Sequence, residues 1–458
     1  MVKVKVLQQM PAPSTGRSSN IERYQRNKDP LLHPLERSRE YTRALNAVKL
    51  ERIFAKPFLG TLDGHTDAVR CITKTKSALC PLFSGSCDGE VKLWNLARKE
   101  VVRSVRAHQG FVRGMCTAQK DKFLFTCGDD KLVKQWAVKD FEQRTDENED
   151  GKDILFDEEQ IEPLKTFHSA SLLTSIDHHW KQSLFATSGE TVDVWDHHRS
   201  SPLQSFEWGC DYVISTRFNP AEPALLASTG ADCSIGLYDL RGNSAIRKVI
   251  LKHRNNALCW NPREPINFTV ASEDNNLYTF DMRNLSCAMQ EHRDHVMAVM
   301  DVDYSADGKE FVSASYDKTV RIFNIYSSTS REVYHTKRMQ RVLAARYSAD
   351  NRFVFTGSED TNVRIWKATA WEKLGALGSR EKTAIAYREK LKDRFQHLPE
   401  IRRIKKHRHV PKIIKSMHNQ ERAKLASKKR KEENVRKHIK SAPAPIARKK
   451  KGIRKQEE

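Results

Sequence analysis

Clusters of lysine and arginine near the end of the chain are the residues whose types and spacing point most clearly to a chemistry. The stretch IRRIKKHRHVPK, residues 401–412, and the run KKRK, residues 428–431, concentrate cations over a short length of chain. Cations at this density neutralise phosphates and release counterions, which predicts salt-sensitive, sequence-independent attraction to RNA or DNA. The residues expected to bind RNA or a partner are Arg402, Arg403, Lys405, Lys406, His407, Arg408, His409, Lys412, Lys428, Lys429, Arg430 and Lys431.

The distribution of charge supports this interpretation. The chain carries a formal net charge of +22, divided into +7 over residues 1–60, −4 over residues 61–370 and +19 over residues 371–458. A segregated basic tail favours a polyanionic partner. The run KKRK and a similar run at 448–451 are also typical of nuclear import signals, and both uses can share residues. A solvated charged helix is the simpler alternative.

Motifs of catalysis and metal binding are missing from the sequence. There is no P-loop, no G-x-G-x-x-G that opens a helix, no H-E-x-x-H and no G-x-S-x-G. The nine cysteines form no C-x-x-C pair, and His407 and His409 have no cysteine or acid at ligand spacing. We therefore expect no enzyme activity, metal, cofactor or small-molecule substrate. The start does not resemble a signal peptide, and no run of about 18 apolar residues occurs, so we expect an intracellular protein without a membrane partner.

A repeated pattern occupies the chain before this basic tail. An Asp in a turn, followed six residues later by an aromatic residue that ends a short apolar strand, recurs as in DGEVKLW and DTNVRIW. The spacings of the seven aromatic residues are 42, 59, 43, 42, 43 and 43, against roughly 40–45 residues for one propeller blade. The sequence therefore predicts an all-β, seven-bladed WD-repeat propeller with helical N-terminal and C-terminal extensions. The aromatic residues are Trp94, Trp136, Trp195, Tyr238, Phe280, Phe323 and Trp366.

The polar residues of the repeat are interpreted as structural. As in other WD-repeat proteins, a loop His, a turn Asp and a strand aromatic should join one hydrogen-bonded network, because buried polar groups need partners. Blade three has Gly189 in place of the Asp, which predicts looser locking there. We assign to the network His65, Asp88, Trp94, His108, Asp130, Trp136, Trp195, Asp232, Asp274, Asp317, Asp360 and Trp366, with upstream histidines at His168, His292 and His335.

The ring needs one strand from outside the repeats. The seventh unit ends at Trp366 with three strands, whereas the segment PFLGTL, residues 57–62, reads as an outer strand without a blade. Since an open ring would leave strand edges unpaired, we expect 57–62 to close blade seven. The predicted organisation is an N-terminal extension with a helix over 1–56, the propeller over 57–370 and the basic helical tail over 371–458.

An acidic insert and two helical patterns complete the chain. Residues 140–163 hold eleven acids against two bases, which fits a solvated disordered loop or an acidic contact. The N-terminal extension should contain a helix that packs beside the ring, with Tyr41, Leu45 and Val48 on one face, and a basic helix is expected over 413–439. A third helix, expected to end at Pro399, should dock on the propeller or on a separate partner through an apolar stripe formed by Ala384, Tyr387, Leu391, Phe395 and Leu398.

Several segments outside the repeat pattern resemble a known family. The N-terminal block LLHPLERSREYTRALNAVKLERIFAKPF, the internal segments IDHHW, YTFDMR and REVYHTKRMQ, and the tail segment IKKHRHVPK resemble the Sof family. These are eukaryotic WD-repeat proteins of the small-subunit processome, the particle that processes the precursor of 18S rRNA. The resemblance implies a nuclear, nucleolar ribosome-biogenesis factor that scaffolds processome proteins and associates with pre-rRNA and a small nucleolar ribonucleoprotein.

The resemblance also implies a second activity. Animal members of the family are associated with cullin-RING ubiquitin ligases as substrate receptors, which commonly carry an aromatic-Asp-x-Arg box at the end of a blade strand. Here Tyr238 and Phe280 begin two such boxes in adjacent blades. A receptor that binds a ligase adaptor is therefore the alternative function, although the basic tail favours the assembly factor. The box residues are Asp239, Arg241, Asp281 and Arg283.

Overall fold

The computed structural model describes residues 29–118, 121–139, 162–207, 209, 211–242, 245–438, 450 and 452–457. Two compact units divide the chain: residues up to 53 together with 375–405 form one, and residues 54–374 together with 406–458 form the other. The acidic insert lies outside the described residues apart from Glu162 and Pro163. Among the described helices, none is long and apolar enough to cross a bilayer.

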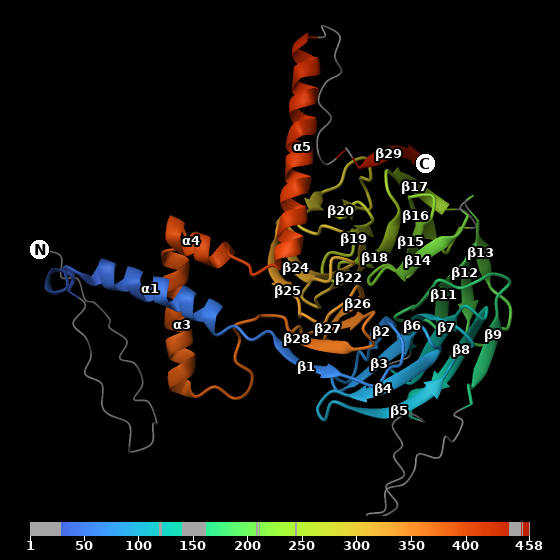
Figure 1. The fold of residues 1–458 in the computed structure, drawn as a ribbon. Helices are drawn as coiled ribbons and strands as arrows, with labels where there is room; N and C mark the ends of the chain where they lie inside the picture. Colours follow the sequence, from blue (N-terminus) through green and yellow to red (C-terminus); the bar gives the residue numbers. More distant parts are fainter. Residues whose placement is uncertain are drawn as a thin grey trace, which may run out of the picture. The chain divides into compact units, whose positions relative to one another are not determined.

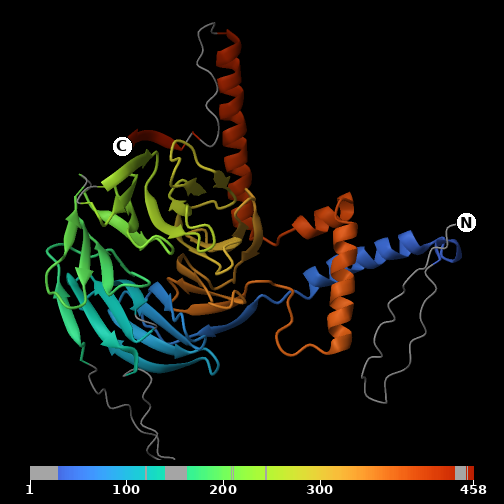
Figure 2. The same ribbon diagram turned by 180° about the vertical axis from the view of Figure 1, so that it is seen from behind.

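The larger unit contains a ring of seven antiparallel sheets, which confirms the predicted propeller (Figures 1 and 2). Blade one contains β2 (Val69–Lys74), β3 (Pro81–Ser86), β4 (Glu90–Asn95) and β5 (Glu100–Arg106). Blade two contains β6 (Val112–Ala118), β7 (Phe123–Gly128), β8 (Leu132–Ala137) and β9 (Lys165–His168). Blade three contains β10 (Ser175–His178), β11 (Leu184–Ser188), β12 (Val192–Asp196) and β13 (Gln204–Phe206).

The remaining blades repeat this order. Blade four contains β14 (Val213–Phe218), β15 (Leu225–Gly230), β16 (Ser234–Asp239) and β17 (Ala245–Leu251). Blade five contains β18 (Asn255–Trp260), β19 (Asn267–Ser272), β20 (Leu277–Asp281) and β21 (Gln290–His292). Blade six contains β22 (Val299–Tyr304), β23 (Glu310–Ser315), β24 (Val320–Asn324) and β25 (Ser330–Tyr334). Blade seven contains β26 (Val342–Tyr347), β27 (Phe353–Ser358), β28 (Val363–Lys367) and β1 (Phe58–Leu62).

Blade seven is closed by a strand from the other end of the propeller, as predicted. Strand β1 pairs antiparallel with β28, so that Phe58 lies opposite Trp366 and Leu62 lies opposite Val363. Leu62 is fully buried, and the rings of Phe58 and Trp366 meet edge to face with centroids 5.4 Å apart. The ring therefore joins early and late segments of the chain through backbone hydrogen bonds and apolar contacts.

The strand aromatics fill the space between neighbouring blades. Trp136 of blade two lies in one apolar cluster with Val91 and Leu93 of blade one. Phe280 of blade five likewise packs with Ile235 of blade four. Because sheets stacked in this way bury both faces of their middle strands, the repeat needs a large apolar residue at this position.

Blade two contains the complete polar network that the sequence predicts. His108 Nδ1 lies 2.9 Å from the Asp130 carboxylate, and His108 Nε2 lies 2.8 Å from Thr126 Oγ1. The indole N–H of Trp136 donates to the same Thr126 hydroxyl at 3.0 Å. The network ties the loop before the blade to its second and third strands.

The donor–acceptor pair between the strand aromatic and a hydroxyl recurs around the ring. The indole nitrogens of Trp94, Trp195 and Trp366 donate to the hydroxyls of Ser84, Thr187 and Thr356 at 2.6, 2.9 and 2.9 Å respectively. Blade three keeps this bond although it lacks the turn Asp. The turn aspartates of three other blades bond instead to neighbouring strand residues: Asp232 to Lys248, Asp274 to Tyr278 and Asp360 to Arg364.

The predicted role of His292 is wrong, and His295 takes its place. His295 Nδ1 lies 2.9 Å from Asp317, and His295 Nε2 lies 2.7 Å from Ser313 Oγ. His292 is in β21 of blade five and contacts the Thr279 hydroxyl at 3.0 Å. The separation between His295 and Asp317 is 22 residues, the same as between His108 and Asp130. The sequence could have identified His295 by its separation from the turn Asp, because the lengths of the loop and of the first two strands of a blade set that separation.

The histidines proposed for blades three and seven do not join such a network either. His168 is the exposed last residue of β9, and His335 contacts His409 of the tail instead of Asp360. In blade three, the Ser171 hydroxyl accepts a hydrogen bond of 3.3 Å from the backbone N–H of Glu190, beside the turn where other blades have an Asp.

The smaller unit is helical. It contains a 3₁₀ turn, η1 (Pro30–Leu32), and the helices α1 (Glu36–Ile53), α3 (Ser379–Arg394) and α4 (Pro399–Lys406). Ala44 and Val48 of α1 are buried with Leu391 of α3 and Ile401 of α4 in one apolar cluster. The apolar stripe of α3 therefore packs on the N-terminal helix, which neither predicted host included.

Charged side chains border this helical contact. Arg394 pairs with Glu40 at 2.6 Å, and Lys392 pairs with Glu51 at 2.5 Å. Pro399 is the first residue of α4 and does not end α3, which stops at Arg394. A proline fits the first turn of a helix because its missing N–H would have no intrahelical partner there.

The end of the tail differs from the all-helical prediction. Helix α5 (Lys412–His438) agrees with the expected basic helix, but strand β29 (Ile453–Glu457) follows it in the described residues. Strand β29 pairs antiparallel with β17, so that Ile453 lies opposite Leu251, and blade four becomes five-stranded (Figure 1). Ile453 also packs against the apolar cluster between blades four and five.

Candidate nucleic-acid interface and protein-binding edge

The segment of the basic tail between α4 and α5 contacts the ring. The guanidinium of Arg408 lies 3.7 Å from the Glu332 carboxylate of β25, and the two side chains are 16% and 8% exposed. The imidazoles of His409 and His335 are stacked, with nitrogens 3.3 Å apart. The structure thus gives Arg408 and His409, two of the predicted RNA-binding residues, contacts within the chain.

Helix α5 continues this attachment over its first turns. Ile414 is buried, and the Asn275 amide of blade five donates to the Glu421 carboxylate at 3.0 Å. Lys412, at the start of the helix, is exposed. The sequence analysis missed Asn275 and Glu421, because a single polar pair 146 residues apart leaves no pattern in the sequence.

The C-terminal part of α5 projects away from the ring (Figures 1 and 2). The whole helix holds ten Lys or Arg residues and three Glu, and the run 428–431 is exposed throughout. Ion pairs on this part of the helix join residues one turn apart at the surface, Lys429 with Glu433 and Arg436 with Glu432, at 3.6 and 4.0 Å. Such pairs contribute only a few tenths of a kcal/mol, about 0.3–0.5, so they compete weakly with a phosphate. The residues from 422 to 438 form a cationic rod about 25 Å long.

The other predicted tail residues belong to the helical unit or to the connection after it. Ile401 of α4 faces the apolar cluster, whereas Arg402, Arg403 and Lys405 are exposed. The backbone carbonyl of Lys405 accepts a hydrogen bond of 2.7 Å from Arg52 of α1. Lys406 and His407 are exposed. The structure thus divides the predicted cations between two units, and the run 428–431 lies on α5.

The two aromatic-Asp-x-Arg boxes occupy equivalent places in adjacent blades. Each box spans the end of the third strand, β16 or β20, and the Asp carboxylate accepts the backbone N–H of its own box arginine, at 3.0 Å for Arg241 and 2.9 Å for Arg283. Both arginines are exposed. The boxes therefore present two guanidinium groups from the same edge of neighbouring blades.

The two box arginines differ in their surroundings. The Arg283 guanidinium forms two hydrogen bonds to the Asp281 carboxylate, at 2.9 and 3.2 Å, while its side chain remains 67% exposed. This contact lowers the pKa of Asp281 below its usual value. Arg247 of β17 donates to the Arg283 carbonyl at 2.9 Å and so connects blade four to the second box. Asp281 thus holds Arg283 in one orientation on the surface.

One trio of potential metal ligands occurs among the described residues. Ligand atoms of His65, Asp88 and Glu90 lie within 4.8 Å of one another. His65 Nε2 is hydrogen-bonded to Ser84 at 2.5 Å, Asp88 accepts the backbone N–H of Glu90 at 3.0 Å, and Glu90 pairs with Lys92 at 3.1 Å. Burial, assisted by the nearby Lys92 charge, lowers the pKa of His65 to about 4. These contacts mark the trio as part of the hydrogen bonding that stabilises blade one.

Comparisons with known proteins agree with both parts of the chain. Residues 368–453 match the Sof1-like domain, and residues 56–95, 99–137, 286–324 and 331–367 match the WD domain, G-beta repeat. The crystal structure of the WD40 β-propeller domain of Doa1 matches with a TM-score of 0.56 at 18% identity, over 69% of this chain and 97% of that one. At this identity the likeness supports the fold alone.

Three relatives match over nearly the full length. "DDB1- and CUL4-associated factor 13" of Danio rerio is 50% identical over 446 residues, 97% of each chain. The protein of the same name in Homo sapiens is 50% identical over 451 residues, 98% of each chain. "Protein SOF1" of Saccharomyces cerevisiae is 44% identical over 446 residues, 95% of this chain and 91% of that one.

Fold and tail together define a WD-repeat β-propeller protein with a basic helical C-terminal domain. The full-length identities identify the family as well: this chain belongs to the Sof family of WD-repeat proteins, with the relatives named DDB1- and CUL4-associated factor 13 and Protein SOF1.

Proposed function

We propose that this chain is a non-enzymatic ribosome-biogenesis factor of the small-subunit processome, required for pre-rRNA processing and maturation of 18S rRNA. In this role the propeller binds other processome proteins, and helix α5 contacts pre-rRNA or the small nucleolar ribonucleoprotein. The protein resides in the nucleolus of the nucleus. Membership of the Sof family supports the proposal.

The observation that carries the RNA-binding part is the exposed cationic rod. Ring contacts through Arg408, His409 and Glu421 hold the tail around the start of α5, while Lys428–Lys431 stay in solvent without a strong internal partner. Such an exposed helix loses little hydration energy when it binds a phosphate backbone, and it recognises the charge of the backbone instead of the base sequence.

RNA crosslinking in cells tests the proposal. Full-length protein should crosslink to pre-rRNA or small nucleolar RNA, and replacement of Lys428, Lys429, Arg430 and Lys431 by Gln should reduce the recovered fragments severalfold. A matched variant that replaces the exposed ring cations Arg98, Lys122, Lys181 and Lys309 by Gln should retain them. Equal recovery from the two variants would move the RNA contact away from α5, and a library that resembles background in the unmodified protein would refute RNA binding.

A second candidate function is that of a substrate receptor for a cullin-RING ubiquitin ligase. The two equivalent box arginines at one edge of blades four and five support it, as do the names of the animal relatives. If this edge binds the adaptor, replacing Arg241 and Arg283 by Ala should abolish copurification of adaptor and cullin, while pre-ribosomal association persists. Undiminished copurification, or none with the unmodified protein, would remove this candidate.

A further inference from the structure

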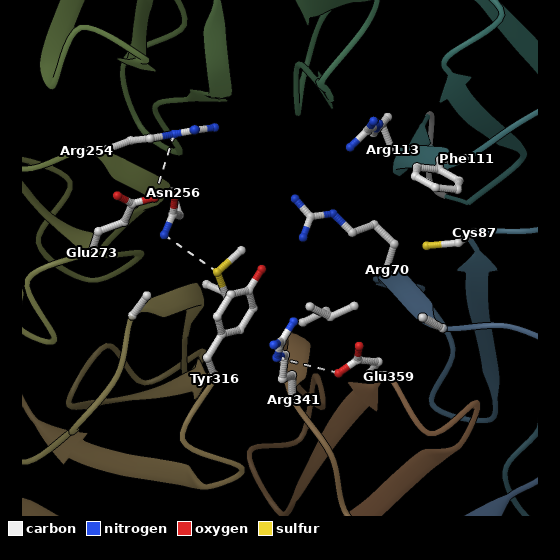
Figure 3. A pocket seen from close by; sticks show the side chains of 14 residues that line it. Arg70, Cys87, Phe111, Arg113, Arg254, Asn256, Glu273, Tyr316, Arg341 and Glu359 are labelled. Carbon is white, nitrogen blue, oxygen red and sulfur yellow. Dashed lines mark hydrogen bonds and ion pairs between the residues drawn. The ribbon is translucent and has the colours of Figure 1, made fainter. Parts of the chain in front are cut away.

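Four arginines converge at one mouth of the ring, where a cavity of about 420 Å³ opens between the inner ends of five blades (Figure 3). Its walls come from blades one, two, five, six and seven, at the starts of first strands and just after second strands. The arginines are Arg70, Arg113, Arg254 and Arg341.

Three of these arginines form an ion pair with an acid and lie over an aromatic ring. Arg113 binds both carboxylate oxygens of Asp129, at 2.6 and 3.0 Å, with its guanidinium 5.1 Å from the centre of the Phe111 ring. Arg254 and Arg341 lie 4.0 and 3.8 Å from the carboxylates of Glu273 and Glu359. Their guanidinium groups are stacked over the tyrosines Tyr212 and Tyr316, at 5.3 and 5.2 Å.

Arg70 has no such acid. It stands on β2 where Arg113 stands on β6, but the residue that follows the second strand is Cys87 in blade one and Asp129 in blade two. Within the part of the chain that the structure describes, no hydrogen bond or ion pair of the Arg70 side chain occurs. Figure 3 shows its guanidinium pointing into the middle of the mouth, between Arg113 and Arg341. A cation placed next to other cations in a partly enclosed cavity is expected to attract an anion.

We propose that this mouth binds an extended segment of a partner protein through one anionic side chain, a carboxylate or a phosphorylated hydroxyl, which pairs with Arg70. Glu273 and Glu359 lie in the same wall, and Asp129 already neutralises Arg113. These acids repel a run of phosphates, so the mouth suits a single anion and not an RNA backbone.

The rest of the wall fits the uncharged flanks of such a segment. Ala298, Met300 and Leu343 supply apolar contacts beside the arginines. The inference gives a location to the protein scaffolding of the proposed function, and it does not depend on RNA binding by the tail.

Degenerate peptide pools with one fixed central residue test the proposal on the full-length protein. The fixed residue is Glu, phosphoserine, Gln or Lys, and binding of each pool is measured. One charge-assisted contact of about 1.4 kcal/mol corresponds to a tenfold preference, so the Glu or phosphoserine pool should bind about ten times more tightly than the Gln pool. A difference between the two anionic pools identifies the source of the anion.

Two variants examine Arg70 by independent routes. Arg70→Gln removes the cation, and Cys87→Asp supplies the internal acid that blade two has, so both should abolish the preference for anionic pools. Arg98→Gln, an exposed cation outside the mouth, should keep it. Thermal unfolding of each variant monitors the fold, and two variants with different chemistry guard against the misfolding of one.

The outcomes separate this proposal from that for the tail. No preference in the unmodified protein, or a preference that survives both mouth variants, overturns it. Weaker binding of a twelve-nucleotide oligouridine to Arg70→Gln would assign the mouth to RNA and also overturn it. Replacement of Lys428–Lys431 by Gln should weaken oligouridine binding while the preference for anionic peptides remains. The peptide experiment therefore tests the mouth even if the proposal for the tail fails.

Discussion

Replacing Lys428, Lys429, Arg430 and Lys431 by Gln should flatten the salt dependence of RNA binding by a definite amount. All four side chains are exposed, and Lys429, whose side chain is 69% exposed, lies 3.6 Å from the Glu433 carboxylate. Each phosphate neutralised on single-stranded RNA contributes about −0.7 to the slope of log affinity against log salt, so four contacts contribute about −3. Between about 50 and about 200 mM salt, the unmodified protein should lose about 50-fold more affinity than the variant.

Fluorescence anisotropy with a labelled oligouridine, titrated at four or five salt concentrations, measures this slope. Arg408→Gln is the informative control, because Glu332 already holds that guanidinium and its loss should change the slope by less than one phosphate, about 0.7. The reasoning is refuted if the two variants change the slope equally, or if the four-residue variant binds more weakly with an unchanged slope. The second result would mean that these residues act through shape or through protein contacts.

Three further outcomes concern the stability of the ring. A chain that begins at residue 64 should aggregate or melt without cooperativity, whereas one that begins at residue 54 and keeps β1 should show a single thermal transition; equal melting would reject closure by this strand. Thr126→Val leaves two buried nitrogens, His108 Nε2 and Trp136 Nε1, without their hydrogen-bond partner and should cost about 1–3 kcal/mol in denaturant unfolding, with Thr126→Ser as the near-neutral control. Burial, as the largest cause, lowers the pKa of His65 and His292 to about 4, while the unfolded value is about 6.5. Because the unfolded chain takes up protons first, stability should be full above about pH 7 and fall as the pH drops toward 4, by up to about 2 kcal/mol per histidine between pH 7 and 5; stability that does not change over this interval would contradict the burial argument.

The parts of the fold with a strong repeated pattern could be predicted from the sequence. Blade number followed from the aromatic spacing, and closure by residues 57–62 followed from the missing fourth strand at Trp366. The basic helix α5 followed from composition and the lack of breakers. In each case many residues, or an unpaired edge, pointed to the same structure.

Features that depend on single contacts between distant residues could not be predicted in this way. Strand β29 is held mainly by backbone hydrogen bonds to β17, which leave no side-chain pattern in the segment IRKQE. The choice of His295 over His292 depends on a loop length of three residues. The unpaired Arg70 could not be predicted, because it depends on Cys87 standing where blade two has Asp129. This equivalence becomes visible only when the strands of the two blades are known.

The pairing of β1 with β28 has a consequence for the biosynthesis of the chain. The two strands lie about 300 residues apart in sequence, so ribosomes adding about 5–20 residues per second need roughly 15–60 s to make the second after the first. Through that interval Phe58 and Leu62 lack their partners in β28, Trp366 and Val363, and the ring cannot close. Contacts between residues so far apart form slowly and leave strand edges open to other chains. The nascent protein is therefore most vulnerable to aggregation in the time before residue 367 is synthesised, and a chaperone that binds the N-terminal strand should raise the yield of closed rings.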